Sequence, residues 1–143
     1  MSNKVTVRYL ENLQHQVIAS PHSFIVDEPI EDAGDGLGPN PYDLLLSAIG
    51  ACTAMTLIMY ANRKKIPVET VSVELDHERI YREDCEDCSE EERRMEKISR
   101  RITVGGAISE EQKGKLLEIA KKCPVHRTIS AKPVVEDIIE IVG

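Results

Sequence analysis

The feature that most constrains this chain is a run of 18 residues without a charge, from Leu44 to Ala61. A run of this length is either a membrane-spanning helix or a helix that protein covers on nearly every side. The run also contains serine, threonine, glycine and tyrosine, and nothing else in the chain resembles a membrane span. We therefore predict a buried core helix and no membrane association. Because 143 residues offer little to cover it, we also expect a partner subunit.

The boundaries of this helix are marked by residues suited to helix ends. Asn40 is a favourable N-cap, Pro41 fits the first helical position, and Asp43 favours the positive end of the helix dipole. Basic residues at 63–65 suit the opposite end, and Pro67 lies just beyond them. Small residues crowd the middle of the run and allow another backbone to approach closely. The sequence thus predicts one helix over about 41–63.

The flanking segments mostly alternate between apolar and polar residues, which is typical of strands. A glycine-rich stretch over 31–39 lacks the lysine of a phosphate-binding loop and is interpreted as a connector. Ser109 and Gln112 form a capping-box pattern that begins a second helix ending near Lys121. The order of strands, long helix, strands, helix and strand predicts a single α+β domain over 1–143. The predicted strands cover 5–10, 16–19, 23–27, 68–80, 98–104 and 133–142.

Composition narrows the classes of function. The formal charge of −7 and the scarcity of aromatic residues (no Trp, one Phe, four Tyr) argue against nucleic-acid binding. The first ten residues lack the apolar stretch of a signal peptide. Four cysteines are too few for a secreted disulfide scaffold of this size. We therefore expect a cytoplasmic protein whose cysteines are reduced, catalytic or metal-bound.

Two cysteines carry the most specific chemical signal. Cys52 lies in the middle of the uncharged run, and Cys123 opens the segment Cys-Pro-Val-His126-Arg127. A buried helix cysteine is commonly just a small apolar residue, and burial raises the pKa of its thiol. Cys123 follows a predicted helix end, and its basic neighbours could favour a thiolate. If the two sulfurs meet, they would form a two-electron redox centre.

A second pair, Cys85 and Cys88, lies in an acidic segment at 82–96. A CxxC spacing is found in redox dithiols and in halves of zinc sites. Together with Cys123 and His126 it could supply a Cys₃His ligand set for a structural zinc ion. The alternative is an exposed auxiliary dithiol without a metal.

The stretch Gly38-Pro-Asn-Pro-Tyr-Asp-Leu-Leu-Leu-Ser-Ala-Ile-Gly-Ala-Cys52-Thr, followed downstream by Cys123-Pro, resembles the OsmC/Ohr family of osmotically inducible protein C-like and organic hydroperoxide resistance proteins. The Cys-Pro-Val-His-Arg-Thr segment is similar to the OsmC-like branch. The resemblance implies an intertwined α+β homodimer with long central helices against antiparallel sheets. It also implies peroxidase chemistry on organic hydroperoxides, with Cys52 as the attacking thiol and Cys123 as the resolving thiol. A dithiol reductant would regenerate both, and no cofactor is implied.

One part of the family pattern differs in this chain. Peroxidases of the family activate the thiolate with an N-terminal arginine and a glutamate directly after Asn-Pro, where this chain has Tyr42. The candidates for activation are therefore Arg127, His126 and Arg8. Two other functions stay open beside the peroxidase: a non-catalytic ligand-binding protein of the same fold, and the zinc-stabilised protein described above.

Overall fold

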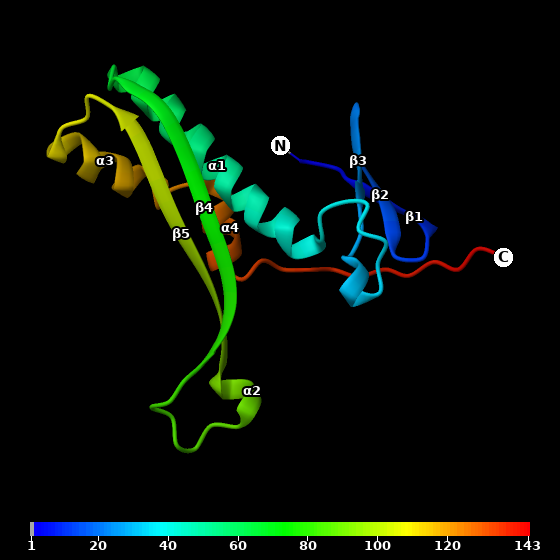
Figure 1. Cartoon of the computed structure of the whole chain (residues 1–143). Helices are drawn as coiled ribbons and strands as arrows, with labels where there is room; N and C mark the ends of the chain where they lie inside the picture. Colours follow the sequence, from blue (N-terminus) through cyan, green and yellow to red (C-terminus); the bar gives the residue numbers. More distant parts are fainter. Residues whose placement is uncertain (1) are drawn as a thin grey trace. The chain divides into compact units, whose positions relative to one another are not determined.

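A computed structural model describes residues 2–143 of the chain (Figure 1). It divides into two compact units, each of which is described by itself. The first unit comprises the chain up to Ser47 together with His77–Lys97. The second unit comprises Ala48–Asp76 and Ile98–Gly143. Each unit is thus built from two separate segments of the chain. The long helix and the two long strands each contribute residues to both units.

The first unit contains a three-stranded sheet of β1 (Thr6–Glu11), β2 (Gln14–Ala19) and β3 (His22–Val26). The strands are antiparallel in the order β1-β2-β3. Asn12, in the turn between β1 and β2, has a φ of 51°, a conformation that asparagine tolerates better than most residues. The three strands predicted before the long helix are therefore confirmed.

The glycine-rich connector after β3 is organised by a buried carboxylate, that of Asp27. Its oxygens accept hydrogen bonds from the backbone N–H groups of Glu28 at 2.8 Å, Leu37 at 3.1 Å and Asp35 at 3.2 Å. Burial raises the pKa of Asp27, but these N–H donors together lower it by more than burial raises it. The net pKa therefore lies below its usual range. The connector also contains the short 3₁₀ helix η1 (Ile30–Asp32). It is thus a structural loop held by one charge.

Helix α1 (Pro41–Lys64) confirms the predicted long helix. Asn40 caps it as expected, because its side chain accepts the N–H of Asp43 at 2.8 Å and the Asp43 carboxylate accepts the N–H of Asn40 at 3.0 Å. By length and hydropathy α1 could cross a membrane, a test that the core helix of a soluble protein also passes. Its buried residues recur every three or four positions, so one face packs on protein: Ile49, Gly50, Thr53, Leu57 and Ala61.

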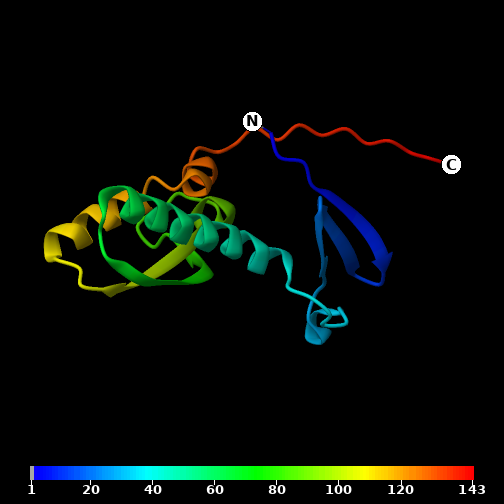
Figure 2. The ribbon, with the colours of Figure 1, turned by 90° about the horizontal axis from the view of Figure 1, so that it is seen from above.

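In the second unit, α1 and α3 (Glu110–Ala120) pack on the same side of a two-stranded ribbon (Figure 2). The ribbon consists of β4 (Val68–Tyr81) and β5 (Arg94–Gly106), both longer than the strands predicted at 68–80 and 98–104. The core of this unit is built around Leu57, Leu116 and Ala120. Partly buried side chains from the ribbon and both helices complete it, among them Tyr60, Val71, Ile102, Val104 and Ile119.

The C-terminal part of the chain differs from the prediction in two places. A seven-residue helix that was not predicted, α4 (Pro124–Ser130), follows Cys123. The predicted final strand over 133–142 has no regular secondary structure, and its branched apolar side chains are exposed. A strand needs a neighbour for its backbone hydrogen bonds, and within residues 2–143 this segment pairs with none.

The loop between β4 and β5 carries the second cysteine pair. Cys85 and Cys88 form a disulfide, with their Cα atoms 5.6 Å apart. The one-turn helix α2 (Glu90–Arg93) follows, and its capping box joins Ser89 and Glu92. The acidic segment noted at 82–96 thus contains a disulfide and a short helix, neither of which was predicted.

Candidate functional site

Cys52 lies at the middle of α1 and is partly exposed. The residue that follows, Thr53, is fully buried and points into the core. Cys52 therefore sits at the boundary between the buried face of the helix and its solvent-facing side.

Cys123 is the N-cap residue of α4, and its exposed fraction is 0%. Proline at the next position suits the first turn of a helix, since its missing N–H needs no partner there. The N–H groups of Val125 and His126, in the first turn of α4, stabilise negative charge on the Cys123 sulfur. The Cys-Pro pattern thus places the thiol at the start of a helix, whose backbone N–H groups lower the pKa of Cys123.

Cys52 and Cys123 are both free thiols, and each shifts the pKa of the other, so the two side chains are neighbours. Burial raises the pKa of Cys52, and the hydrogen bond to Cys123 and the charge of that residue raise it further. Burial also raises the pKa of Cys123, but the hydrogen bond from Cys52 and those from the His126 N–H and the Thr53 hydroxyl outweigh it. The net pKa of Cys123 is therefore lowered. The pair therefore titrates as a unit: it loses its first proton at a lower pH, and its second proton at a higher pH, than an isolated thiol would.

An arginine that sequence reasoning missed is linked to this pair. The guanidinium of Arg100, on β5, donates to the Thr53 hydroxyl at 2.8 Å and to the Ala120 carbonyl at 3.2 Å. The Thr53 hydroxyl in turn donates to the Ile49 carbonyl at 2.7 Å. A hydroxyl has one proton, so Thr53 can turn it from that carbonyl toward a Cys123 thiolate while Arg100 holds the oxygen in place. The one sequence signal for Arg100 is a basic residue on the inward phase of an alternating strand.

The structure distributes the three predicted activating residues differently. The backbone N–H of His126 lowers the pKa of Cys123. The backbone N–H of Arg127 donates to the Cys123 carbonyl at 3.0 Å, and the residue is exposed. Arg8 lies on β1 in the first unit, whereas both free cysteines belong to the second. Asp43, next to the position of the family glutamate, serves as a helix cap.

The four zinc candidates are not gathered into a ligand set. Cys85 and Cys88 are bonded to each other, and a disulfide sulfur is not the thiolate that zinc requires. Throughout the described part of the chain, no group of three or more His, Cys, Asp or Glu side chains is arranged to hold a metal ion. Cys123 and His126 instead belong to the helix-start geometry described above.

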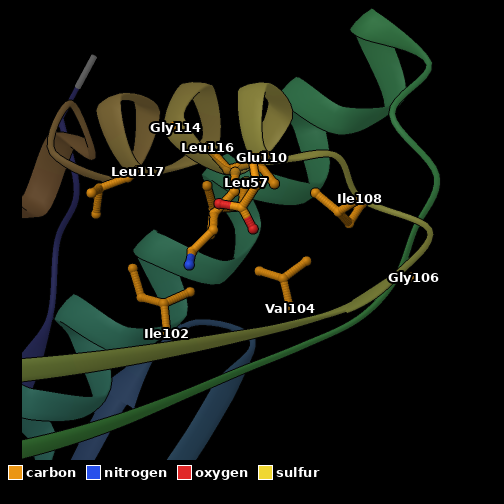
Figure 3. A pocket seen from close by; sticks show the side chains of 10 residues that line it. Leu57, Ile102, Val104, Gly106, Ile108, Glu110, Gly114, Leu116 and Leu117 are labelled. Atoms are coloured by element: carbon orange, nitrogen blue, oxygen red, sulfur yellow. The ribbon is translucent and has the colours of Figure 1, made fainter.

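A cavity of about 530 Å³ lies in the second unit between α1, α3 and β5 (Figure 3). The side chains of Leu57, Ile102, Val104 and Leu116 point into it, with Glu110 and Lys113 among the polar groups that line it. Neither free cysteine lines this cavity. It is therefore a second apolar feature, separate from the thiol pair.

Comparison with known proteins agrees with this fold and gives it a context. The family model described as OsmC-like protein matches residues 34–137. An OsmC-like protein from Mycoplasma pneumoniae is 20% identical, with a TM-score of 0.73 over 92% of this chain and 89% of that one. An organic hydroperoxide resistance protein from Legionella pneumophila is 18% identical, with a TM-score of 0.65 over 90% and 89%.

A second organic hydroperoxide resistance protein, from Elizabethkingia anophelis, is 15% identical. Its TM-score is 0.64, over 92% of this chain and 91% of that one. No curated protein matches the sequence significantly. At these identities the similar structures establish the α+β fold, which confirms the predicted fold class.

Proposed function

Because the chain belongs to the OsmC-like protein family, which its match over residues 34–137 shows, we propose that it is a thiol-dependent peroxidase for organic hydroperoxides. The observation that carries this proposal is the neighbouring pair of free thiols, one on a partly exposed residue and one on a buried residue. Two of the structurally similar proteins are described as organic hydroperoxide resistance proteins, which supports this substrate class.

The exposures of the two cysteines suggest their roles. The attacking sulfur must be reached by the peroxide, which favours the partly exposed Cys52 over the fully buried Cys123. The lowered pKa of Cys123 makes it the more acidic thiol of the pair. In its thiolate form Cys123 can act as the base that accepts the proton of Cys52, and later as the resolving thiol. In this assignment the partly exposed cysteine attacks the peroxide, and the more acidic cysteine serves as its base.

The chemistry balances with these two sulfurs and an external reductant. The proton of Cys52 passes to the Cys123 thiolate, and the new Cys52 thiolate attacks the terminal oxygen of the hydroperoxide. The O–O bond breaks, Cys52 becomes a sulfenic acid, and the alkoxide leaves with the proton from Cys123 as an alcohol. The Cys123 thiolate then attacks the Cys52 sulfur, forming the disulfide and expelling hydroxide, which solvent protonates. A dithiol returns both cysteines to thiols by exchange.

The proposed working form is a homodimer of this chain. Helix α1 exposes an apolar face in the second unit, with Met55 64% and Met59 71% exposed and the small residues Ala48 and Ala51 in line with them. These positions recur at helical spacing and lie away from the buried face that contains Leu57. Small residues let two helices approach closely, so a second copy of α1 would fit this face.

The C-terminal segment supports the same partner. Its branched residues Val134, Ile138, Ile139, Ile141 and Val142 are each about 90% exposed. Such a segment is costly to leave in water and has no strand neighbour among residues 2–143. Pairing with a second copy would bury it and would make the homodimer intertwined.

The peroxidase proposal is tested by mass. Reduced protein is mixed with tert-butyl hydroperoxide, and the peptides containing Cys52 and Cys123 are analysed without reduction. We expect a Cys52–Cys123 disulfide within one turnover, and a trappable Cys52 sulfenic acid in Cys123→Ser. The variant with Cys85→Ser and Cys88→Ser should react like the unmodified protein. If Cys52 stays a thiol in excess hydroperoxide, the chain is not a peroxidase.

The apolar cavity favours a second candidate function, the binding of an apolar ligand without catalysis. Its volume is in the range of small-molecule sites, and its lining is mainly aliphatic. Gly114 lines the cavity, and an added Cβ there would meet no atom within 4 Å. The variant Gly114→Leu would project a side chain into the space. Loss of a co-purified ligand from native mass spectra in this variant, but not in Cys52→Ser, would favour binding over catalysis.

A further inference from the structure

The Cys85–Cys88 disulfide lies in the loop that joins β4 and β5, outside the proposed peroxidase chemistry. Both cysteines are partly exposed, and the residues between and around them are mostly exposed as well. We propose that this disulfide is a second redox site, which exchanges with dithiols and with monothiols, and which prefers those that are neutral or positively charged near the attacking sulfur. The proposal does not depend on the peroxidase activity.

The disulfide contributes little to the stability of the loop. It closes a loop with only two residues between the cysteines, and the stabilisation from a cross-link grows with the length of the loop it closes. Other contacts already hold this segment. The N–H of Arg82 donates to the Arg93 carbonyl at 2.8 Å, and the Ser89–Glu92 capping box begins α2. The loop should therefore keep its course when the disulfide is reduced.

A guanidinium is anchored inside the same loop. Nη2 of Arg93 donates to the carbonyl of Glu86, which lies between the two cysteines, at 3.0 Å. Nε of Arg93 is buried and is the one buried side-chain nitrogen or oxygen among the described residues without a hydrogen-bond partner. An unsatisfied buried donor is costly, and a nearby thiolate is an acceptor it could use. The guanidinium thus contacts the backbone between the two cysteines, where a cation would stabilise the sulfur that leaves when the disulfide is attacked.

The surrounding charges select the attacking thiol. The loop and the short helix after it are rich in exposed carboxylates, whereas the basic residues of this segment, Arg82, Arg93 and Arg94, flank it. An anionic thiol such as glutathione meets repulsion here, and a neutral or cationic reductant does not. The carboxylates in question are those of Glu83, Asp84, Glu86, Asp87, Glu90, Glu91 and Glu92.

The exchange balances in two steps. A thiolate of the dithiol attacks one sulfur of the pair, the Cys85–Cys88 bond breaks, and the released cysteine leaves as a thiolate that Arg93 stabilises. The second thiol of the reductant then attacks the mixed disulfide and releases the other cysteine. Two electrons and two protons pass from the dithiol to the pair, and the reductant leaves as its own disulfide.

The test uses a chain in which Cys52 and Cys123 are both serine, so that Cys85 and Cys88 are the remaining cysteines. Oxidised protein is treated with cysteamine, 2-mercaptoethanol or glutathione at equal thiolate concentration. The released thiols are then alkylated, and the fraction of reduced protein is measured by mass spectrometry. We expect reduction by cysteamine to be about tenfold faster than by glutathione at low salt, with the difference shrinking as salt screens the charges. Equal rates with all three thiols, or a disulfide that resists them, would overturn the proposal.

Arg93→Gln and Arg82→Gln are matched variants of the same loop. The Nε of Arg82 already donates, to the Met95 sulfur at 3.1 Å, whereas the Nε of Arg93 has no partner among the residues described. Arg93→Gln should raise the pKa of the reduced pair and slow reduction several-fold, whereas Arg82→Gln should not. Should the double-serine chain fail to fold, the same rates are measured on the unmodified chain. The intact protein is reduced and alkylated first, and the peptide containing residues 85–88 is then quantified after proteolysis. An identical effect of both arginine variants would contradict a specific role for Arg93.

Discussion

Arg100 and Thr53, 47 positions apart in the sequence, are joined by a 2.8 Å hydrogen bond. The bond connects the middle of β5 to the helix position directly after Cys52. Because Thr53 also stabilises negative charge on Cys123, Arg100 is linked through one hydroxyl to the thiol pair. We interpret Arg100 as a positioning residue in the place where the predicted activators Arg127, His126 and Arg8 were expected to act.

Replacing Arg100 with Gln should therefore slow the oxidation of Cys52 by an organic hydroperoxide about tenfold, equivalent to ~1.4 kcal/mol in the barrier. The loss of the bond to the Ala120 carbonyl should also lower the free energy of unfolding by about 1–3 kcal/mol. Stopped-flow oxidation and chemical denaturation measure the two effects separately.

Arg100→Lys keeps the charge and should recover part of the rate. Arg101→Gln is the matched control, because Arg101 is the next residue on the same strand and is exposed. An equal loss of rate in both glutamine variants would mean that general charge, and not the Thr53 contact, determines reactivity.

The pH dependence of the thiol pair should show two separate steps. Cys123 has a lowered pKa, so the folded protein gains its first thiolate at a pH below the ordinary thiol range. Cys52 has a raised pKa, so the second thiolate forms above that range. The first shift adds to stability as pH rises and the second removes stability at high pH, because a group ionises more easily in the state with its lower pKa.

Ultraviolet absorbance of the thiolates measures these steps, in a chain with Cys85→Ser and Cys88→Ser. Cys52→Ala removes a hydrogen-bond donor and should raise the pKa of Cys123, whereas Cys52→Ser retains a donor and should raise it less. In Cys123→Ser the pKa of Cys52 should fall, because a neighbouring thiolate is gone. A single step at the ordinary thiol pKa in the unmodified pair would show that the sulfurs do not share a proton.

The exposed face of α1 should govern assembly. Met55→Glu places a charge on this face and should convert a dimer to monomers, since a buried unpaired carboxylate is strongly disfavoured at a helix–helix contact. Sedimentation velocity across a range of protein concentrations measures the change. Lys64→Glu is the control, because position 64 lies on the opposite side of the helix from Met55 by helical spacing. A dimer that survives Met55→Glu would place the interface elsewhere.

Two glycines of the second unit should respond to alanine in opposite directions. Gly114 lies inside α3 with open space around it, so Gly114→Ala should stabilise the fold by about 0.5–1 kcal/mol through helix propensity. Gly106 has a φ of 138°, and a Cβ there would collide with the Pro67 carbonyl. Gly106→Ala should therefore destabilise the fold. Thermal unfolding of both variants checks the pair, and a shift of the same sign in both would contradict the geometry.

Much of the local structure was determined by the sequence itself. The cap at Asn40, the apolar run and the basic end predicted α1 to within a residue, because the energies that begin and end a helix come from residues close in the chain. The strands before and after it were recognisable from their composition and alternation for the same local reason. The segment around Cys52 and the Cys-Pro at 123 were also sufficient to indicate the family.

The tertiary structure decided which side chains meet. Periodicity could place Arg100 on the inward face of a strand, but it could not say that this face meets Thr53 and the end of α3. It could not show that Cys52 and Cys123 are neighbours, because 70 intervening residues separate them and only packing closes that distance. The 133–142 segment has strand-forming residues but no partner in its own chain. Hydrogen bonds between distant segments depend on register and packing, and these are properties of the whole fold.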